Sequence, residues 1–235
     1  MLPFSTDLHS HLIPGIDDGA VDMEESLNLL HRLQEIGYRR IVTTPHVMAD
    51  SYRNSSQAIR EGCRILRQAA QNQGIEMEIS AAAEYYMDEE LLRRVKAKDI
   101  LTVGEGYLLF ETSYYSHPLY LEQNVYEIAA SGYRPLMAHP ERYRYVREPE
   151  RFYGRLRELG VVFQVNINSF GGHYGDDARK KAYWLAEKGW ITFLGSDLHH
   201  RRQAEFLAES VASGLLVPIL QKNDILNDTL QFSEH

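Results

Sequence analysis

The sequence predicts an α/β fold, a parallel (β/α) barrel formed as a single domain over residues 1–235. A repeated pattern supports this: an amphipathic stretch ends at a glycine, and a short apolar run follows at once, at Gly37, Gly74, Gly132, Gly160 and Gly189. Glycine closes a helix readily, and runs rich in Val, Ile, Phe and Tyr favour buried strands. Two further apolar runs, 4–8 and 107–110, bring the total to about seven strands joined by right-handed crossovers. A doubly wound open sheet is the alternative.

Two of the helices have clear start signals. Asp22 and Glu25 form a capping-box pattern at the start of an apolar stripe with helical spacing, namely Met23, Leu27, Leu30 and Leu33. Pro149 suits the first turn of a later helix, and apolar residues follow it at helical spacing.

Composition excludes several classes of function. The formal net charge of −8 disfavours binding to nucleic acid or to an anionic membrane surface. No apolar run approaches the roughly 20 residues that span a bilayer, so we expect no membrane insertion. The N-terminus lacks a basic region followed by an apolar one, which predicts no secretory signal. Cys63 is the single cysteine, which we interpret as a small buried residue rather than a nucleophile; a cytoplasmic location fits.

Side chains able to bind a metal ion stand at nearly every predicted strand end. These ends converge on one face of a parallel barrel. His9 and His11 are two residues apart on a strand, so both imidazoles point the same way. Later strands end at His46, Glu84, Glu111, His139, the 166–168 segment, and the pair Asp197 and His199. Nitrogen and carboxylate ligands suit Mn, Fe or Zn, whereas a polar barrel mouth without metal is the simpler alternative.

Asp17, Asp18 and Gly19 follow the first strand and allow two interpretations. Asp and Gly form turns readily, so the segment is explained by a turn alone. Alternatively, one of the two carboxylates folds back over the metal ions.

These motifs resemble one family. DLHSHLIPGIDDG, TTPH, AAAEYY, LLFETS, MAHPERY and LGSDLHH occur in the order and spacing of the polymerase-and-histidinol-phosphatase (PHP) superfamily. Within it, they resemble the bacterial metal-dependent protein-tyrosine phosphatases of capsule and exopolysaccharide operons. The resemblance extends from Asp7 to His200. It implies a distorted, TIM-like barrel of seven strands that holds three divalent ions (Mn, Fe or Zn).

The resemblance also implies a role for each matching residue. The first ion would be held by His9, His11, Glu84 and Asp197; the second by Glu84, Glu111 and His139; the third by Asp18, His46 and His199. Arg142 matches an arginine that binds phosphate in the family. The second phosphate-binding arginine is either Arg201 or Arg202, or neither.

The implied activity is hydrolysis of phosphotyrosine on a protein, with a membrane-associated bacterial tyrosine kinase that regulates capsule or exopolysaccharide synthesis as the partner. Metal-bound water, whose pKa falls toward about 7, is expected to attack phosphorus directly. One alternative is a small-molecule phosphatase of the histidinol-phosphate type. An amidohydrolase is disfavoured, because Glu84 stands where those enzymes usually carry a modified lysine. The remaining alternative is a metal-stabilised interaction module without catalysis.

Overall fold

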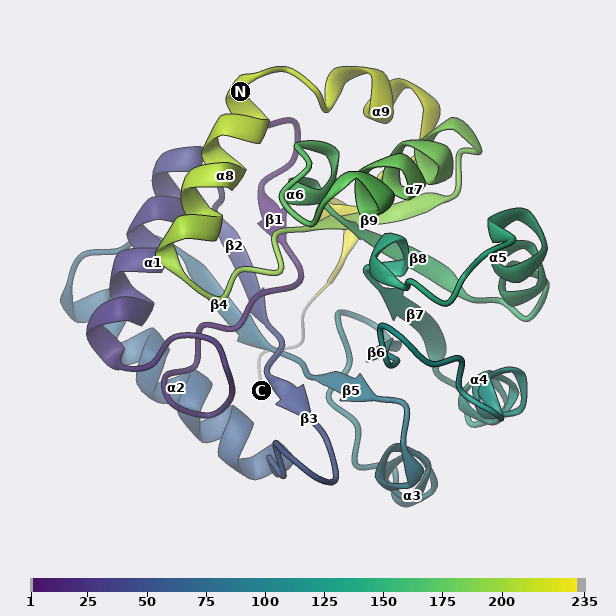
Figure 1. The fold of residues 1–235 in the computed structure, drawn as a ribbon. Coiled ribbons are helices and arrows are strands. Elements are labelled where there is room, and N and C mark those ends of the chain that lie inside the picture. Colours follow the sequence, from purple (N-terminus) through teal and green to yellow (C-terminus); the bar gives the residue numbers. More distant parts are fainter. Residues whose placement is uncertain (1, 232–235) are drawn as a thin grey trace.

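The computed structural model describes residues 2–231, with the strands at the centre and the longer helices around them (Figure 1). Every ladder between named strands is parallel, which confirms the α/β class. One sheet has the order β1–β2–β4, with β1 (Thr6–Asp7), β2 (Arg40–Thr43) and β4 (Glu78–Ala81). The other has the order β3–β5–β6–β7–β8–β9, with β3 (His46–Val47), β5 (Glu84–Tyr86), β6 (Tyr107–Glu111), β7 (Arg134–Ala138), β8 (Val162–Asn166) and β9 (Ile191–Gly195). Because the ladders form two sheets, closure into one seven-stranded barrel stays a prediction.

Helices connect successive strands and cover their outer side (Figure 1). They are α1 (Met23–Ile36), α2 (Ser56–Asn72), α3 (Glu89–Ala97), α4 (Leu121–Ala130), α5 (Pro149–Glu158), α6 (Ile167–Phe170), α7 (Asp176–Glu187), α8 (Arg201–Ala212) and α9 (Val217–Lys222), with 3₁₀ turns η1 (Pro140–Arg142) and η2 (Asn227–Thr229). Within residues 2–231, no helix has both the length and the apolar character needed to cross a membrane.

The predicted helix signals are borne out, with one difference. The Asp22 carboxylate accepts a hydrogen bond from the Glu25 amide at 2.9 Å and so caps α1. The Glu25 side chain, however, accepts from the amide of Val21 rather than from that of Asp22. Gly37 ends α1 with a φ of 121°, a conformation that favours glycine, and Pro149 begins α5.

Two predicted strands are each broken just before a candidate ligand. The second strand stops at Thr43 and resumes as β3 at His46, and the third resumes as β5 at Glu84. Pro45 explains the first break, because it has no amide hydrogen to continue the ladder, while its carbonyl accepts from the Glu84 amide at 3.1 Å. The short strands then pair His46 directly with Glu84. A further difference is Asn168, which lies in α6 rather than at a strand end.

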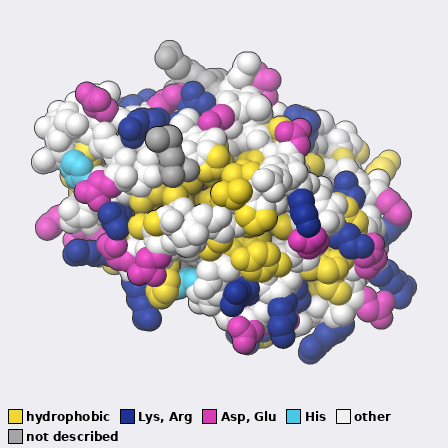
Figure 2. Space-filling view, turned by 90° about the horizontal axis from the view of Figure 1, so that it is seen from above, with side chains coloured by type: hydrophobic (Ala, Val, Ile, Leu, Met, Phe, Trp, Pro, Cys, Tyr) yellow, Lys and Arg dark blue, Asp and Glu magenta, His cyan; other side chains and the backbone are white. Residues whose placement is uncertain are grey.

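Most strands are buried on both faces, as parallel strands covered by helices should be, and the partly exposed β4 is an exception. On β6, Leu108 and Phe110 belong to the large core that the helices cover, whereas Leu109 belongs to a smaller apolar cluster. Cys63 is buried in the large core, as expected for a structural residue. On the face drawn in Figure 2, acidic and basic side chains are interspersed around a hydrophobic area, without the single-sign basic patch typical of nucleic-acid binding.

The C-terminal turn η2 is hydrogen-bonded to both the first and the last strand. The side-chain amide of Asn227 donates through Nδ2 to the carbonyls of Thr6 at 2.9 Å and Leu194 at 2.7 Å. Its Oδ1 accepts from the backbone amide of Leu194 at 3.0 Å. The Asp228 carboxylate accepts from the amides of Ser5 and Thr6, each at 2.9 Å. Beyond the ladders, Ser10 and Leu198 form a parallel bridge between the segments that follow β1 and β9.

Candidate metal centre

The structure brings all nine predicted ligand side chains together in one cluster. Three overlapping groups have ligand atoms that lie within 4.8 Å of one another: His11 with Asp18, His46 and His199; His9 with His11 and Glu84; and His46 with Glu84 and Glu111. His139 and Asp197 contact the same carboxylates and imidazoles. Ligands from segments that are far apart in the sequence therefore meet at the carboxyl ends of the strands, as the parallel arrangement predicts.

His9 and His11 present the same nitrogen to the centre of the cluster. Their Nε2 atoms are 3.3 Å apart and lie 3.3 and 3.5 Å from Oε2 of Glu84. The opposite nitrogens are held from behind: Nδ1 of His9 lies 2.7 Å from the Gln164 amide oxygen, and Nδ1 of His11 lies 2.8 Å from the Asp17 carboxylate. Such partners accept a hydrogen bond from an Nδ1–H group, which leaves the Nε2 lone pair available to a cation.

Glu84 lies at the middle of the cluster and carries an unsatisfied oxygen. Nδ1 of His46 lies 3.2 Å from Oε2 of Glu84 and 3.2 Å from Oε1 of Glu111. These three atoms are buried and have no hydrogen-bond partner among the described residues. His139 approaches from the other side, with Nε2 2.9 Å from Oε1 of Glu84. Buried polar atoms without partners are rare in proteins, and a divalent cation among them fits this donor set.

The group around Asp18 opens toward solvent. Oδ1 of Asp18 lies 3.4 Å from Nε2 of His46 and 3.6 Å from Nε2 of His199, and the Asp18 side chain is 56% exposed. Asp17 points inward instead and accepts from the His46 amide at 3.0 Å and the Gly19 amide at 3.0 Å. Asp17 therefore closes a turn and Asp18 faces the histidines, while a role for Asp18 in holding a metal ion stays a prediction.

The backbone is strained where two of the candidate ligands stand. His139, directly after β7, has a φ of 31°, and Asp197, just beyond β9, has a φ of 50°. Non-glycine residues adopt this left-handed region at an energetic cost, and such positions are concentrated at functional sites. Gly19 allows the backbone to pass close to His11, because a Cβ at position 19 would lie 2.1 Å from the carbonyl oxygen of His11.

Within the cluster, the Glu84 carboxylate and the imidazoles of His9 and His46 shift one another's pKa values. Burial alone would lower the pKa of His9, but the Glu84 and Asp197 carboxylates outweigh burial and raise it to about 9. Burial also works against protonation of His46, yet chiefly Glu84 raises its pKa to about 10. Conversely, burial favours a neutral Glu84, but His9 and His46 hold its pKa well below the ordinary value. Metal ions and protons therefore compete for the same nitrogens.

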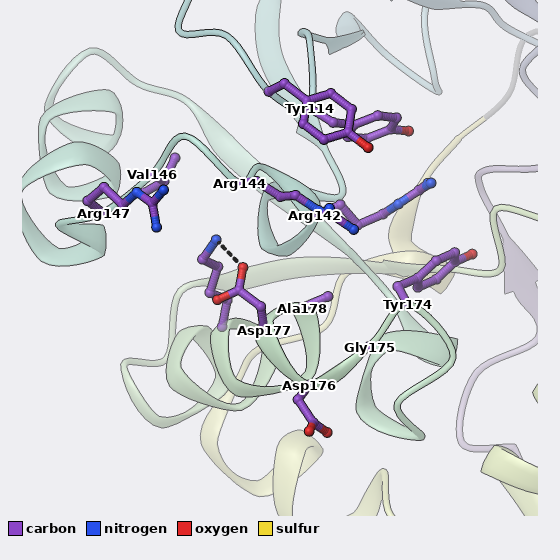
Figure 3. Close-up of a pocket in the computed structure, with 12 residues that line it drawn as sticks. Tyr114, Arg142, Arg144, Val146, Arg147, Tyr174, Gly175, Asp176, Asp177 and Ala178 are labelled. Carbon is purple, nitrogen blue, oxygen red and sulfur yellow. Dashed lines mark hydrogen bonds and ion pairs between the residues drawn. The ribbon is translucent and has the colours of Figure 1, made fainter.

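Arg142 connects the cluster to a pocket of about 540 Å³. Its Nη1 donates to Oδ2 of Asp197 at 2.6 Å. The guanidinium lies between two aromatic rings, 4.6 Å from the centroid of Tyr114 and 4.3 Å from that of Tyr174, and all three side chains line the pocket (Figure 3). The Tyr114 ring in turn lies 5.6 Å from the His139 ring. The pocket thus begins where the cluster of candidate ligands ends.

The other two predicted arginines have neighbours outside the cluster. Arg201 and Arg202 are exposed and begin α8. Arg201 lines a surface groove together with Glu25 and Glu205, and Arg202 lies 5.8 Å over the Phe206 ring. A phosphate-binding role for either one stays a prediction.

Sequence reasoning missed Gln164 behind the cluster and one aromatic residue. The Gln164 amide, which orients His9, also donates to Asn166 at 2.8 Å, and Asn166 donates to Oδ2 of Asp197 at 2.7 Å. The two-residue spacing on β8 was an available signal, because Gln164 and Asn166 share one face of the strand. Tyr174 lies in the loop between α6 and α7, where no periodic pattern marks it.

Comparison with known proteins identifies a family that matches most of this chain. The family described as "Capsular polysaccharide synthesis, CpsB/CapC" matches residues 5–211. The tyrosine-protein phosphatase YwqE of Bacillus subtilis (strain 168) is 30% identical over 201 residues, which cover 85% of this chain and 79% of YwqE.

Solved structures are similar as well. A chain from the crystal structures of YwqE from Bacillus subtilis and CpsB from Streptococcus pneumoniae, described as unique metal-dependent tyrosine phosphatases, has a TM-score of 0.83 and 26% identity over 98% of this chain and 100% of that one. An organophosphorus hydrolase from Deinococcus radiodurans shares the fold, with a TM-score of 0.55 and 13% identity over 97% of this chain and 93% of that one. With most of its length matched by the family, this chain belongs to the CpsB/CapC capsular polysaccharide synthesis family.

Proposed function

We propose that this chain is a metal-dependent protein-tyrosine phosphatase. The observation that carries the proposal is the junction at Arg142, where a buried cluster of imidazoles and carboxylates meets a pocket lined by tyrosines. The relatives named tyrosine-protein phosphatases, which match over most of the chain, support the same reaction. Phosphotyrosine brings an anionic phosphate for the cluster and an aromatic ring for the pocket.

Three divalent ions, of Mn, Fe or Zn, are proposed for the centre. The first would be held by His9, His11, Glu84 and Asp197; the second by Glu84, Glu111 and His139; the third by Asp18, His46 and His199. The orphaned atoms of His46, Glu84 and Glu111 support the set, and the spread of ligand groups over the cluster supports more than one ion. When bound, such ions neutralise the charge on phosphate oxygens and activate water for attack on phosphorus.

Arg142 is proposed to hold the phosphate. Among the described residues it donates a hydrogen bond to Asp197. A guanidinium has further N–H groups, which can donate to two phosphate oxygens at once. The flanking rings of Tyr114 and Tyr174 fix its orientation, and the Asp197 bond ties it to the cluster. Burial raises the pKa of Tyr114 well above its ordinary value, so the phenol stays neutral and does not repel the substrate.

The proposed substrate is a phosphotyrosine protein, namely a membrane-associated bacterial tyrosine kinase in capsule or exopolysaccharide synthesis. Family membership supports the setting. Such a kinase uses ATP, so we propose a cytoplasmic location for the reaction.

We also infer one distorted barrel domain, in which β2 continues as β3 and β4 as β5; the parallel bridge between Ser10 and Leu198 supports closure.

An assay of chelated protein, with Mn, Fe or Zn added back, tests the proposal. A phosphotyrosine peptide should be hydrolysed only after metal addition, and faster than histidinol phosphate. His9→Ala should abolish turnover, because an imidazole at the centre of the cluster is lost. Cys63→Ala, the matched control, should keep turnover, since Cys63 is buried in the core. Preference for histidinol phosphate would indicate the small-molecule phosphatase, and absence of phosphatase activity with bound metal would indicate an interaction module.

A further inference from the structure

We propose that the pocket beside Arg142 selects phosphotyrosine segments that carry acidic residues next to the phosphotyrosine, through Arg144 and Arg147. This proposal rests on the proposed function and adds a substrate preference to it. Both arginines line the same pocket as Arg142, and Figure 3 shows the three in a row that leads from Arg147 near α5 toward Tyr174. A segment whose phosphate lies at Arg142 would therefore extend along the other two.

The charges of these two arginines are not balanced by the protein. Arg144 has a cation–π contact and no ion pair, and Arg147 has no ion pair, within the part of the chain that the structure describes. The other basic residues of the pocket are neutralised: Lys181 pairs with Asp177 at 2.8 Å, and Arg142 pairs with Asp197. The pocket thus offers positive charge from a chain whose net charge is −8.

The opposite wall of the pocket does not cancel this charge. Asp176 stands at the start of α7, where a carboxylate interacts favourably with the helix dipole, and Figure 3 shows it directed away from the arginines. Asp177 is occupied by Lys181. A carboxylate of the substrate is the complementary partner for two exposed guanidinium groups.

Arg144 is also held in place. Its backbone amide donates to the carbonyl of Tyr114 at 2.8 Å, and its guanidinium lies 5.3 Å over the ring of Tyr115. Tyr114 in turn packs over Arg142, so the loop after β6 fixes both arginines relative to each other. A pre-positioned charge loses less entropy on binding than a free one, which favours selectivity.

The test compares two peptides that differ only in charge, one with Asp and one with Asn at three positions on each side of phosphotyrosine. The metal-loaded protein should show a kcat/KM for the Asp peptide that is roughly 3- to 30-fold higher, as expected for two exposed charge pairs. This ratio should fall as salt is raised, because exposed charges are screened. The small substrate p-nitrophenyl phosphate, which has no flanking residues, serves as the reference.

The double variant R144A/R147A should abolish the preference, while turnover of p-nitrophenyl phosphate should fall much less than turnover of the Asp peptide. The control R60A/R64A removes the same charge from α2, outside this pocket, and should keep the preference. The reversal R144E/R147E should favour a Lys-flanked peptide, which keeps the proposal testable if the alanine variant folds poorly.

Equal hydrolysis of both peptides, a preference that survives R144A/R147A, or a parallel loss of p-nitrophenyl phosphate turnover would each overturn the proposal. Failure of the metal-loaded protein to hydrolyse any of the three substrates would instead overturn the proposed function. The two failures are therefore distinguishable.

Discussion

Asp17→Asn is expected to weaken metal binding although Asp17 itself is not a predicted ligand. The Asp17 carboxylate contacts Nδ1 of His11 at 2.8 Å and accepts from the amides of His46 and Gly19. Burial would raise the pKa of Asp17, but the His11 imidazole and these hydrogen bonds hold it well below its ordinary value. Asn offers a single acceptor oxygen, so it cannot serve Gly19 and His11 from separate oxygens.

The magnitude follows from the bond that is lost. A hydrogen bond to a charged group contributes about 1.5–3 kcal/mol, and partners behind a metal-binding histidine typically account for about 10- to 100-fold in affinity. These ranges agree, because about 1.4 kcal/mol corresponds to a tenfold change in binding. We therefore expect the dissociation constant of the most weakly bound divalent ion to be roughly 10- to 100-fold higher in Asp17→Asn.

The assay is a titration of the chelated protein with Mn or Zn, followed calorimetrically, with circular dichroism as the check on folding. Asp22→Asn is the matched control: it makes the same substitution at the cap of α1, where Asn performs about as well as Asp. Equal affinities for Asp17→Asn and the unaltered protein, or an equal loss in Asp22→Asn, would refute the role assigned to Asp17.

Three further predictions concern the loop after β1 and the C-terminal turn. Gly19→Ala should lower metal affinity, because its Cβ would lie 2.1 Å from the His11 carbonyl oxygen; Gly154→Ala, whose Cβ would meet its nearest atom at 3.8 Å, should bind normally in the same titration. Asn227→Ala should reduce the free energy of unfolding in urea by about 2–4 kcal/mol, since three buried hydrogen bonds are lost; a change below about 1 kcal/mol contradicts this. Asp228→Asn should destabilise the protein at pH 7, and by progressively less as the pH falls below about 3.9. Burial opposes ionisation of Asp228, yet hydrogen bonds from the amides at β1 lower the pKa of its carboxyl group. The stabilisation by the ionised carboxylate is therefore present above the ordinary pKa of about 3.9 and is lost as the pH falls. A stability difference between the two proteins that does not vary with pH contradicts this.

Much of the metal centre could be predicted from the sequence, because parallel strands impose a simple rule. Polar residues at strand ends meet on one face whatever the intervening helices are, so His9, Glu111 and His139 could be grouped without knowing any distance. The two-residue periodicity of a strand predicted that His9 and His11 act together; their Nε2 atoms do meet, although both residues lie beyond β1, which ends at Asp7. The helix signals at Asp22 and Pro149 are local, and the structure confirms the start of each helix.

The rest depends on contacts between distant segments. The interruption between β2 and β3 follows from Pro45, a breaker that is visible in the sequence, whereas the break between β4 and β5 lies in the alanine run 81–83, which carries no such signal. The choice between Asp17 and Asp18 depends on where the His11 imidazole lies, which is a tertiary contact. The row of arginines beside Arg142 is formed by a loop with no repeating pattern, so the pocket emerges only from the folded chain.

Elemental analysis of the folded protein tests the central claim most directly. After chelation and reloading with Mn, Fe or Zn, the protein should retain about three divalent ions per chain, and Glu84→Gln, which alters the carboxylate shared by two groups, should retain fewer. A reloaded protein that is folded by circular dichroism yet holds no divalent ion would contradict the account.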